Sequence, residues 1–348
     1  MMKLLMMKLA VVFFAVFMLF QGAQVQAADI ELVPTMKSES TAPNRVWVGT
    51  FQLVWNKFSE SVIKGPIVFE DYDSPVAAAL NEKEFTKDNL SSSAYYIKYG
   101  TPSPKLKQTI ENGIKRKFDE TSDILNTFDW TIDPNKYIVY AMLKKDFKFM
   151  EAFDKLPDGR FGKGSEPVKY FGITNTSSSD LYENVDVLFY RSSSDFAVRL
   201  KTRGKDDVIL YRTNGDGTFN KYYNEVLRKT QRYNDTPIFQ YKDTLSVPDI
   251  NLYLETSFSD VEGHKIKGTD IVIDKTIETV DFKLDNEGVK LKSEAALMAR
   301  NTSFIPVDGR YFNFNDTFVL FLIEKDQQVP YYAMRVEDVS AINKTGRN

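Results

Sequence analysis

His264 is the only histidine of the chain, and no cysteine is present, so a hydrolytic or metal site would have to be built around this one residue. It stands in the polar, turn-like stretch 261–266, which is typical of a solvated loop and favours a surface histidine over a general base. Without cysteine the chain has no thiolate nucleophile and no soft metal ligand. We therefore expect no enzyme, no cofactor and no metal.

Other stretches that suggest chemistry have simpler interpretations. The glycine-rich stretch 159–164 matches neither a dinucleotide fingerprint nor a phosphate-binding loop, and it predicts a flexible connection. The stretch 214–217 lacks the later ligands of a calcium loop, and its Asn-Gly pair indicates a hairpin. Two acidic pairs are more typical of solvated turns than of hydrolytic carboxylates: Asp71/Asp73 and Asp206/Asp207. With 45 basic against 48 acidic residues, the chain has no charge excess for nucleic acid.

The most informative pattern follows Glu287-Gly288. Apolar or small residues alternate there with charged ones in a strand pattern, at a place where a loop is expected. The first set is Val289, Leu291, Ser293, Ala295, Leu297 and Ala299, and the second is Lys290, Lys292, Glu294 and Arg300. Such a segment can enter a sheet that has one buried and one solvated face. An ordinary edge strand or surface loop is the alternative interpretation.

The elements around this segment predict an α+β fold without the βαβ rhythm of a parallel sheet. Strands are expected at 186–190, 196–201, 207–212 and 277–284, and an apolar hairpin at 312–324 and 330–336. An apolar stripe at helical spacing predicts a helix over 45–63, and Ser-Pro pairs at 74–75 and 103–104 begin two more.

The first residues indicate export. Lys3 and Lys8 precede an apolar run at 9–20, and small residues near Ala27 form a cleavage site. Residues 1–27 are therefore predicted to be a secretory signal peptide. The run is shorter than the ~20 residues of a spanning helix, so we expect no membrane anchor after cleavage. Residues 28–43 are predicted to be a flexible leader, and 44–348 a single domain. The expected location is secreted or periplasmic.

The carboxyl-terminal part of the chain resembles the serpins, a family best known for suicide inhibitors of serine and cysteine proteases. Its members have an acidic-Gly hinge after a sheet strand, an exposed reactive loop, and an Asn-x-x-Phe motif before a buried hairpin. Here Glu287-Gly288 matches the hinge, and Asn315 to Phe318 match the motif. Weaker matches lie upstream, at 110–118, 136–143 and 247–257. The resemblance implies a serpin-like α+β fold with large antiparallel-rich mixed sheets, helices packed on one side and an exposed reactive loop.

In serpins a protease cuts the loop, and the freed segment inserts into the main sheet with the enzyme attached. The resemblance therefore implies a target protease of the serine or cysteine class as the partner of a monomeric inhibitor. The hinge would comprise Glu287, Gly288, Val289, Leu291 and Ser293, and the scissile bond would lie among Met298, Arg300, Asn301, Thr302, Ser303 and Phe304. Arg300 would suit a trypsin-like pocket, whereas Met298 or Phe304 would suit a hydrophobic one.

The chain departs from the family at the hinge and in the region that controls sheet opening. Inhibitory members have small residues after the hinge glycine, but Val289 and Leu291 are bulky here. Tyr140 stands where the family has an asparagine, and Glu278 where it has a histidine. Two functions therefore stay open: an inhibitor that works by loop insertion, and a non-inhibitory serpin-like binding or structural protein.

Overall fold

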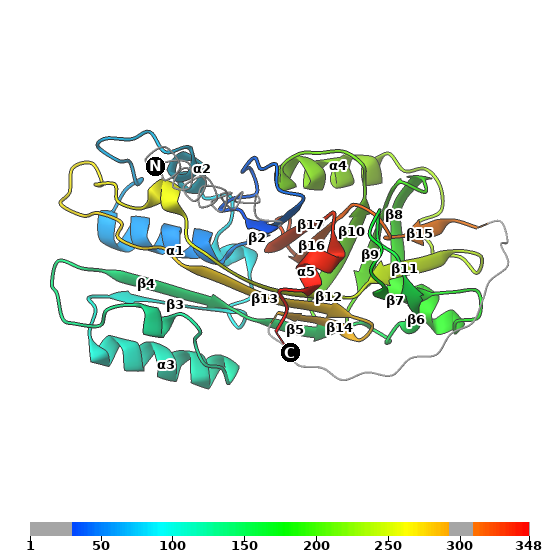
Figure 1. Cartoon of the computed structure of the whole chain (residues 1–348), viewed down its shortest axis with the longest axis horizontal. Helices are drawn as coiled ribbons and strands as arrows, with labels where there is room; N and C mark the ends of the chain where they lie inside the picture. Colours follow the sequence, from blue (N-terminus) through cyan, green and yellow to red (C-terminus); the bar gives the residue numbers. More distant parts are fainter. Residues whose placement is uncertain (1–29, 292–308, 348) are drawn as a thin grey trace, which may run out of the picture.

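The computed structural model describes residues 30–291 and 309–347, and Figure 1 shows an elongated molecule built from several sheets with few helices. The largest sheet has seven strands and is antiparallel except for the pair β1–β2. Its strands, in order across the sheet, are β1 (Ile30–Leu32), β2 (Asn44–Val48), β17 (Tyr332–Val336), β16 (Phe318–Glu324), β10 (Asp206–Arg212), β9 (Asp195–Lys201) and β8 (Val185–Ser192).

This sheet is covered on both faces, which explains why its central strands are continuous apolar runs rather than alternating ones. On one face the helix α4 (Phe219–Gln231) packs Tyr223 against Phe321, with ring centroids 5.3 Å apart. On the other face Phe282 stacks on Tyr332 at 4.6 Å, and this contact joins the sheet to a second sheet. The core therefore lies between the two sheets.

The second sheet has four antiparallel strands and contains the hinge. Its strands, in order, are β12 (Ile250–Thr256), β13 (Glu278–Asp285), β14 (Gly288–Leu291) and β5 (Lys145–Lys148). Next to it, β3 (Tyr95–Gly100) pairs with β4 (Ile138–Leu143). The helices α1 (Thr50–Phe58) and α3 (Pro104–Phe118) lie on opposite sides of this two-stranded sheet (Figure 1).

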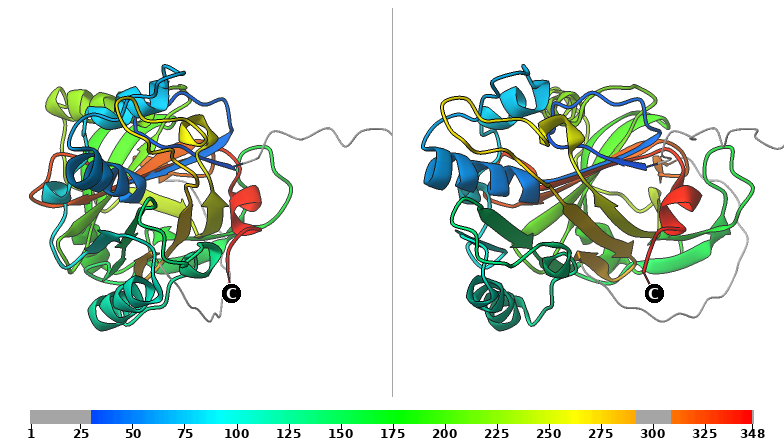
Figure 2. Two further views of the ribbon diagram at one scale, coloured as in Figure 1. Left: turned by 90° about the vertical axis from the view of Figure 1, so that its left-hand side faces the viewer. Right: turned by 60° about the vertical axis from the view of Figure 1, so that its left-hand side comes forward.

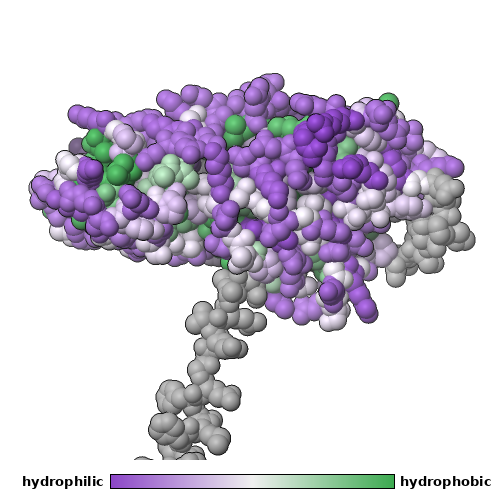
Figure 3. Space-filling model, turned by 90° about the horizontal axis from the view of Figure 1, so that it is seen from above, coloured by the Kyte–Doolittle hydropathy of each residue, from purple (hydrophilic) through white to green (hydrophobic). Residues whose placement is uncertain are grey.

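A third sheet stands at the far end of the molecule, where its strands lie away from α1 and α3 (Figure 1). In order, they are β15 (Tyr311–Asn313), β11 (Thr244–Pro248), β7 (Val168–Ile173) and β6 (Asp154–Gly159). Two short helices complete the fold: α2 (Pro75–Asn81) and α5 (Val339–Asn343). Figure 2 shows α5 on the side of the molecule, close to the end of the chain. The face in Figure 3 is mostly hydrophilic, with small separate apolar areas.

The structure confirms the α+β class with antiparallel-rich mixed sheets. The predicted meander is β8–β9–β10, and the predicted hairpin is β16–β17. The helices after Ser74 and Ser103 begin as expected, since each serine accepts a hydrogen bond from the third residue of its helix, Ala77 or Leu106.

Other predictions were wrong. Residues 45–48 continue a strand instead of a helix, because β2 pairs with β17 and the helix begins only after Gly49. The described part of the predicted flexible leader contains β1, which pairs with β2, and Val33 is buried in the core. The Asn-Gly pair at 214–215 leads into α4 and not into a hairpin. The division into a signal peptide and one domain over 44–348 stays a prediction.

Candidate functional site

The hinge forms a short strand inside the four-stranded sheet. The strand β14 pairs antiparallel with β13 on one side, where Val289 is opposite Leu284. On the other side it pairs antiparallel with β5, where Val289 is opposite Phe147. The Val289 side chain is fully buried, in agreement with the predicted inward set of alternating residues. The residues after Gly288 therefore begin a strand between two existing strands.

The turn before this strand is held by β5 and by the residues that follow it. The carbonyl of Glu287 accepts a hydrogen bond of 2.9 Å from the Phe149 amide, and the carbonyl of Asn286 accepts one of 2.9 Å from the Phe153 amide. A Cβ on Gly288 would lie 2.2 Å from the Phe147 carbonyl oxygen. Because no side chain fits at that distance, glycine is required for β14 to approach β5.

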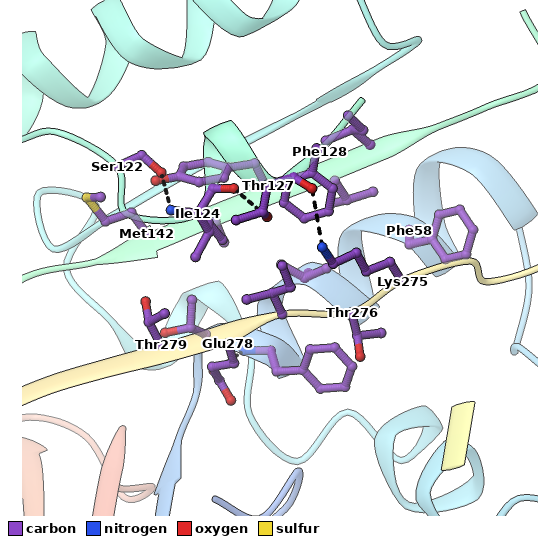
Figure 4. A pocket seen from close by; sticks show the side chains of 18 of the residues that line it. Phe58, Ser122, Ile124, Thr127, Phe128, Met142, Lys275, Thr276, Glu278 and Thr279 are labelled. Carbon is purple, nitrogen blue, oxygen red and sulfur yellow. Dashed lines mark hydrogen bonds between the residues drawn. The ribbon is translucent and has the colours of Figure 1, made fainter. Parts of the chain in front are cut away.

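Among the described residues, no strand stands between the first half of β13 and β4. In the described part of the chain, the first half of β13 pairs only with β12, and β4 pairs only with β3. A cavity of about 460 Å³ lies between the two free edges. Figure 4 shows Ile124, Phe128 and Met142 on one side of it and Lys275, Thr276 and Glu278 on the other. Since β4 precedes β5 in the chain, this gap lies in line with β14.

The floor of the gap is apolar and the far end is bridged. Phe51 and Val54 of α1 line it, and Phe51 packs on Phe258 with ring centroids 4.2 Å apart. At the far end Lys275 Nζ donates a hydrogen bond of 3.2 Å to the Thr127 carbonyl. A strand that extended through the whole gap would have to break this hydrogen bond between Lys275 and Thr127.

Glu278 is the one ionisable side chain of β13 that faces the interior beside the gap. One carboxyl oxygen accepts a hydrogen bond of 2.9 Å from the Phe51 amide, at the beginning of α1. The other oxygen, Oε2, is buried and has no hydrogen-bond partner among the described residues. Burial raises the pKa of Glu278 to about 8, although the bond from Phe51 opposes this change. The carboxyl is therefore largely protonated at neutral pH.

Tyr140 and Glu278 do not meet, although the sequence places both in the region that controls sheet opening. Tyr140 packs with Ile110 and Ile114 on the α3 side of β4. Glu278 lies on the α1 side, where Ala141 is the buried residue of β4 that packs into the main core. Tyr140 and Glu278 therefore lie on opposite faces, and the comparison of each with a family residue stays a prediction.

A buried ionic cluster lies where β14 meets β5, and sequence reasoning missed it. Lys145 Nζ is 2.7 Å from a carboxyl oxygen of Asp206 and 2.5 Å from one of Glu324, and Tyr331 donates a hydrogen bond of 3.0 Å to Asp206. Burial favours a higher pKa for Glu324, but hydrogen bonds from Lys145 and Ser91 lower it below its usual value. The pair Asp206/Asp207, predicted to be solvated, is buried. The sequence signal for this cluster was a pair of acids, Asp206-Asp207, at the beginning of an apolar strand.

The remaining predicted residues are divided between described and undescribed parts. Glu287, Gly288 and Val289 lie together at the hinge, and the backbone of Leu291 ends β14. The others lie outside the described residues: Ser293, Met298, Arg300, Asn301, Thr302, Ser303 and Phe304.

His264 is a surface residue as expected. Its Nδ1 is 3.2 Å from a carboxyl oxygen of Asp71, and its ring stacks on Tyr72 at 4.9 Å. Within residues 30–291 and 309–347, no cluster of three or more histidine and acidic side chains has the arrangement of a metal site. The same ranges contain no helix with the length and apolarity needed to cross a membrane.

Neither a protein-family model nor a curated protein matches the sequence. Solved structures do match. The match to thyroxine-binding globulin in complex with thyroxine has 10% sequence identity and a TM-score of 0.43. It covers 72% of this chain and 78% of the globulin chain. A second structure, of the human globulin, has 10% identity, covers 72% and 77%, and has a TM-score of 0.42.

Serpin48 of the insect Tenebrio molitor, described as a highly specific serpin, has 12% identity and a TM-score of 0.40, and covers 72% of this chain and 78% of its own. The chain is thus similar to solved structures of two proteins, one of which is named a serpin.

Proposed function

We propose that this protein is a serpin-like protease inhibitor that acts by cleavage of its reactive loop and insertion of residues 289–305 into the main sheet. Here this is the four-stranded sheet that contains β14. One observation carries the proposal: β14 already occupies the beginning of a strand position between β13 and β5, and the gap between β13 and β4 continues that position. An inserted strand would complete main-chain hydrogen bonds on both free edges and bury apolar side chains.

The register of β14 indicates which side chains would enter. Continued pairing in the same register would set Ser293 opposite Val280, and Ala295 opposite both Glu278 and Ala141. Because Val289 faces the interior, these odd-numbered residues would face it too. Small residues would thus come beside the buried carboxyl of Glu278. The charged residues between them would face solvent.

The proposed partner is a serine or cysteine protease that cuts within 298–306. Arg300 would bind a pocket with an acidic residue, whereas Met298 or Phe304 would bind an apolar one. The protein would act as a monomer, secreted or periplasmic, after removal of 1–27, and without a cofactor.

A second function is favoured by a different observation at the hinge. Val289 and Leu291 are larger than the residues that fast insertion prefers, and β14 is paired on both sides before any cleavage. A loop held in this way suits a non-inhibitory serpin-like binding or structural protein.

Incubation with a panel of serine and cysteine proteases, followed by denaturing gels and mass spectrometry, tests the proposal. We expect a covalent complex with at least one protease, cleavage within 298–306, and a higher melting temperature of the cleaved protein. Cleavage in the loop with neither a complex nor a higher melting temperature would refute insertion. Cleavage with a higher melting temperature but no complex would favour the second function.

Two variants, each of which introduces a glutamate into the loop, test whether insertion follows cleavage in the proposed register. Ala295→Glu places a second carboxyl opposite Glu278 in the proposed register, so it is expected to be cleaved without forming a complex. Lys292→Glu changes an outward position and is expected to retain the complex. Equal behaviour of the two variants would contradict the register.

A further inference from the structure

The segment 236–241 is part of the connection between α4 and β11, and hydrogen bonds hold its backbone on two sides. On one side the Val187 amide of β8 donates a hydrogen bond of 2.8 Å to the Pro237 carbonyl. On the other side Arg310 donates to the carbonyls of Thr236 and Ile238, at 2.9 and 2.6 Å. We call this segment the 236–241 platform.

The platform is also anchored in the core by one aromatic ring. Phe239 is buried, and its ring centroid lies 5.6 Å from that of Phe312 and 5.9 Å from that of Tyr182. In contrast, Ile238 and Tyr241 are each 69% exposed. The fold thus holds two large apolar side chains in water on a fixed backbone.

Such an arrangement is suited to binding. Tyrosine is enriched among the residues that dominate protein interfaces, because it offers a large apolar ring together with a polar hydroxyl. Association is weakened when a flexible loop must be ordered, but here the backbone is ordered before any partner arrives. Apolar contacts to Ile238 and Tyr241 would therefore contribute directly to affinity.

The platform adjoins the end of the proposed reactive loop. Arg310, which follows the last undescribed residues, holds Asp243 with two hydrogen bonds of 3.2 Å and one of 2.6 Å, so it fastens the loop end to the platform. Figure 1 places β15, β11 and β8 at the same end of the molecule. Phe304 precedes Arg310 by six positions, which is at most about 20 Å of extended chain.

The size of a protease brings the platform within reach of an enzyme that is bound to the loop. A domain of about 220 residues has a radius of gyration of roughly 17 Å and a diameter of about 40 Å. An enzyme with its catalytic cleft on residues near Phe304 therefore extends over the surface around Arg310. Ile238 and Tyr241 are the large apolar side chains exposed there among the described residues.

We propose that Ile238 and Tyr241 form a docking surface for the protease that cuts the reactive loop, and that they bind an apolar area of this enzyme outside its catalytic cleft. The proposal rests on the proposed function, because it needs a protease that cuts the loop. It assigns the platform a role in partner selection and association rate, separate from insertion.

The test is the second-order rate of loop cleavage by each protease of the panel that cuts within 298–306. The double variant Ile238→Ser/Tyr241→Ser is expected to lower this rate about tenfold for at least one protease and to leave the cleavage position and melting temperature unchanged. The matched control is Ile132→Ser/Tyr99→Ser, which removes an isoleucine and a tyrosine that are 70% and 39% exposed elsewhere. It is expected to retain the wild-type rate.

The outcomes separate this inference from the proposed function. Slower cleavage in the double variant, without covalent complexes in any variant, would support the docking surface and refute inhibition. Covalent complexes with an unchanged rate would refute the docking surface and retain inhibition. An equal loss in the control variant, or no cleavage within 298–306 by any protease, would overturn the docking surface. A concentration-dependent dimer that disappears in the double variant would assign the platform to a second copy of the chain instead.

Discussion

Among the described residues, strand β13 is paired on both sides at one end and on one side at the other. At the closed end, Lys283 to Asp285 pair with β14, and β14 pairs with β5. At the open end, Glu278 to Val280 pair, among the described residues, with β12 only, and a cavity separates them from β4. The difference shows that, among the described residues, one strand position is occupied over part of its length, up to the pairing of Leu291 with Lys145.

The largest effect is expected at Lys145. Lys145→Met would leave the buried carboxylates of Asp206 and Glu324 without their cation, and breaking a buried ion pair in this way costs about 3–5 kcal/mol. Urea unfolding at neutral pH measures the loss. The neighbouring Lys144→Met is the control, since its pair with Glu120 is partly exposed and should cost at most about 1 kcal/mol. Equal losses would show that the buried cluster around Lys145 has no special role.

At the open end, Glu278→Gln is expected to remove a pH dependence of stability. The folded chain holds the Glu278 proton up to a pKa of about 8, whereas the unfolded chain releases it near 4.5. The folded state then binds more protons, so stability falls as pH rises through this window. Between pH 5 and pH 9 the difference corresponds to a stability loss on the order of 4 kcal/mol, which the Glu278→Gln variant would not show.

Unfolding at pH 5, 7 and 9 measures this difference. The control is Glu255→Gln, an exposed residue of β12, which pairs with β13 along its whole length, and the pH dependence should stay that of the wild type. Parallel curves for wild type and Glu278→Gln would contradict a buried protonated carboxyl at the gap.

At the closed end, Gly288→Ala is expected to separate β14 from β5, because the added Cβ would meet the Phe147 carbonyl oxygen. We expect a loss of about 2 kcal/mol and faster hydrogen exchange of the Val289 amide. Gly65→Ala is the matched control, since a Cβ there meets nothing within 4 Å. Unchanged exchange at Val289 would mean that β14 tolerates the side chain.

The smallest effect concerns the exposed pair that closes the hinge turn. Lys148 Nζ is 3.2 Å from a carboxyl oxygen of Glu287, and both side chains are 61% exposed. Glu287→Gln should therefore change the free energy of unfolding by less than about 0.5 kcal/mol, and salt should reduce this difference further. A loss above about 1 kcal/mol would show that the turn depends on this pair and not on its backbone hydrogen bonds.

Much of the scaffold follows from local patterns. The strands of the meander and of the hairpin have the alternation or the apolar runs of their buried faces, and the two Ser-Pro helices begin at their capping serines. The turn between β13 and β14 was predictable because Glu287-Gly288 interrupts one alternating segment and begins another. The β2 strand was mistaken for helix because its residues are buried at every position, and such a run has no period that distinguishes the two.

The sequence by itself determined the class of the fold, the turn at Glu287-Gly288 and the inward side chain of Val289, because these depend on residues close together in the chain. Only the tertiary structure decided that β14 stands between β13 and β5 while the gap beside Glu278 stays open. It also decided that Asp206 and Glu324 are buried around Lys145, and that Arg310 fastens the 236–241 platform to the loop end. Burial and strand pairing of this kind depend on segments far apart in the sequence, and local patterns do not contain that information.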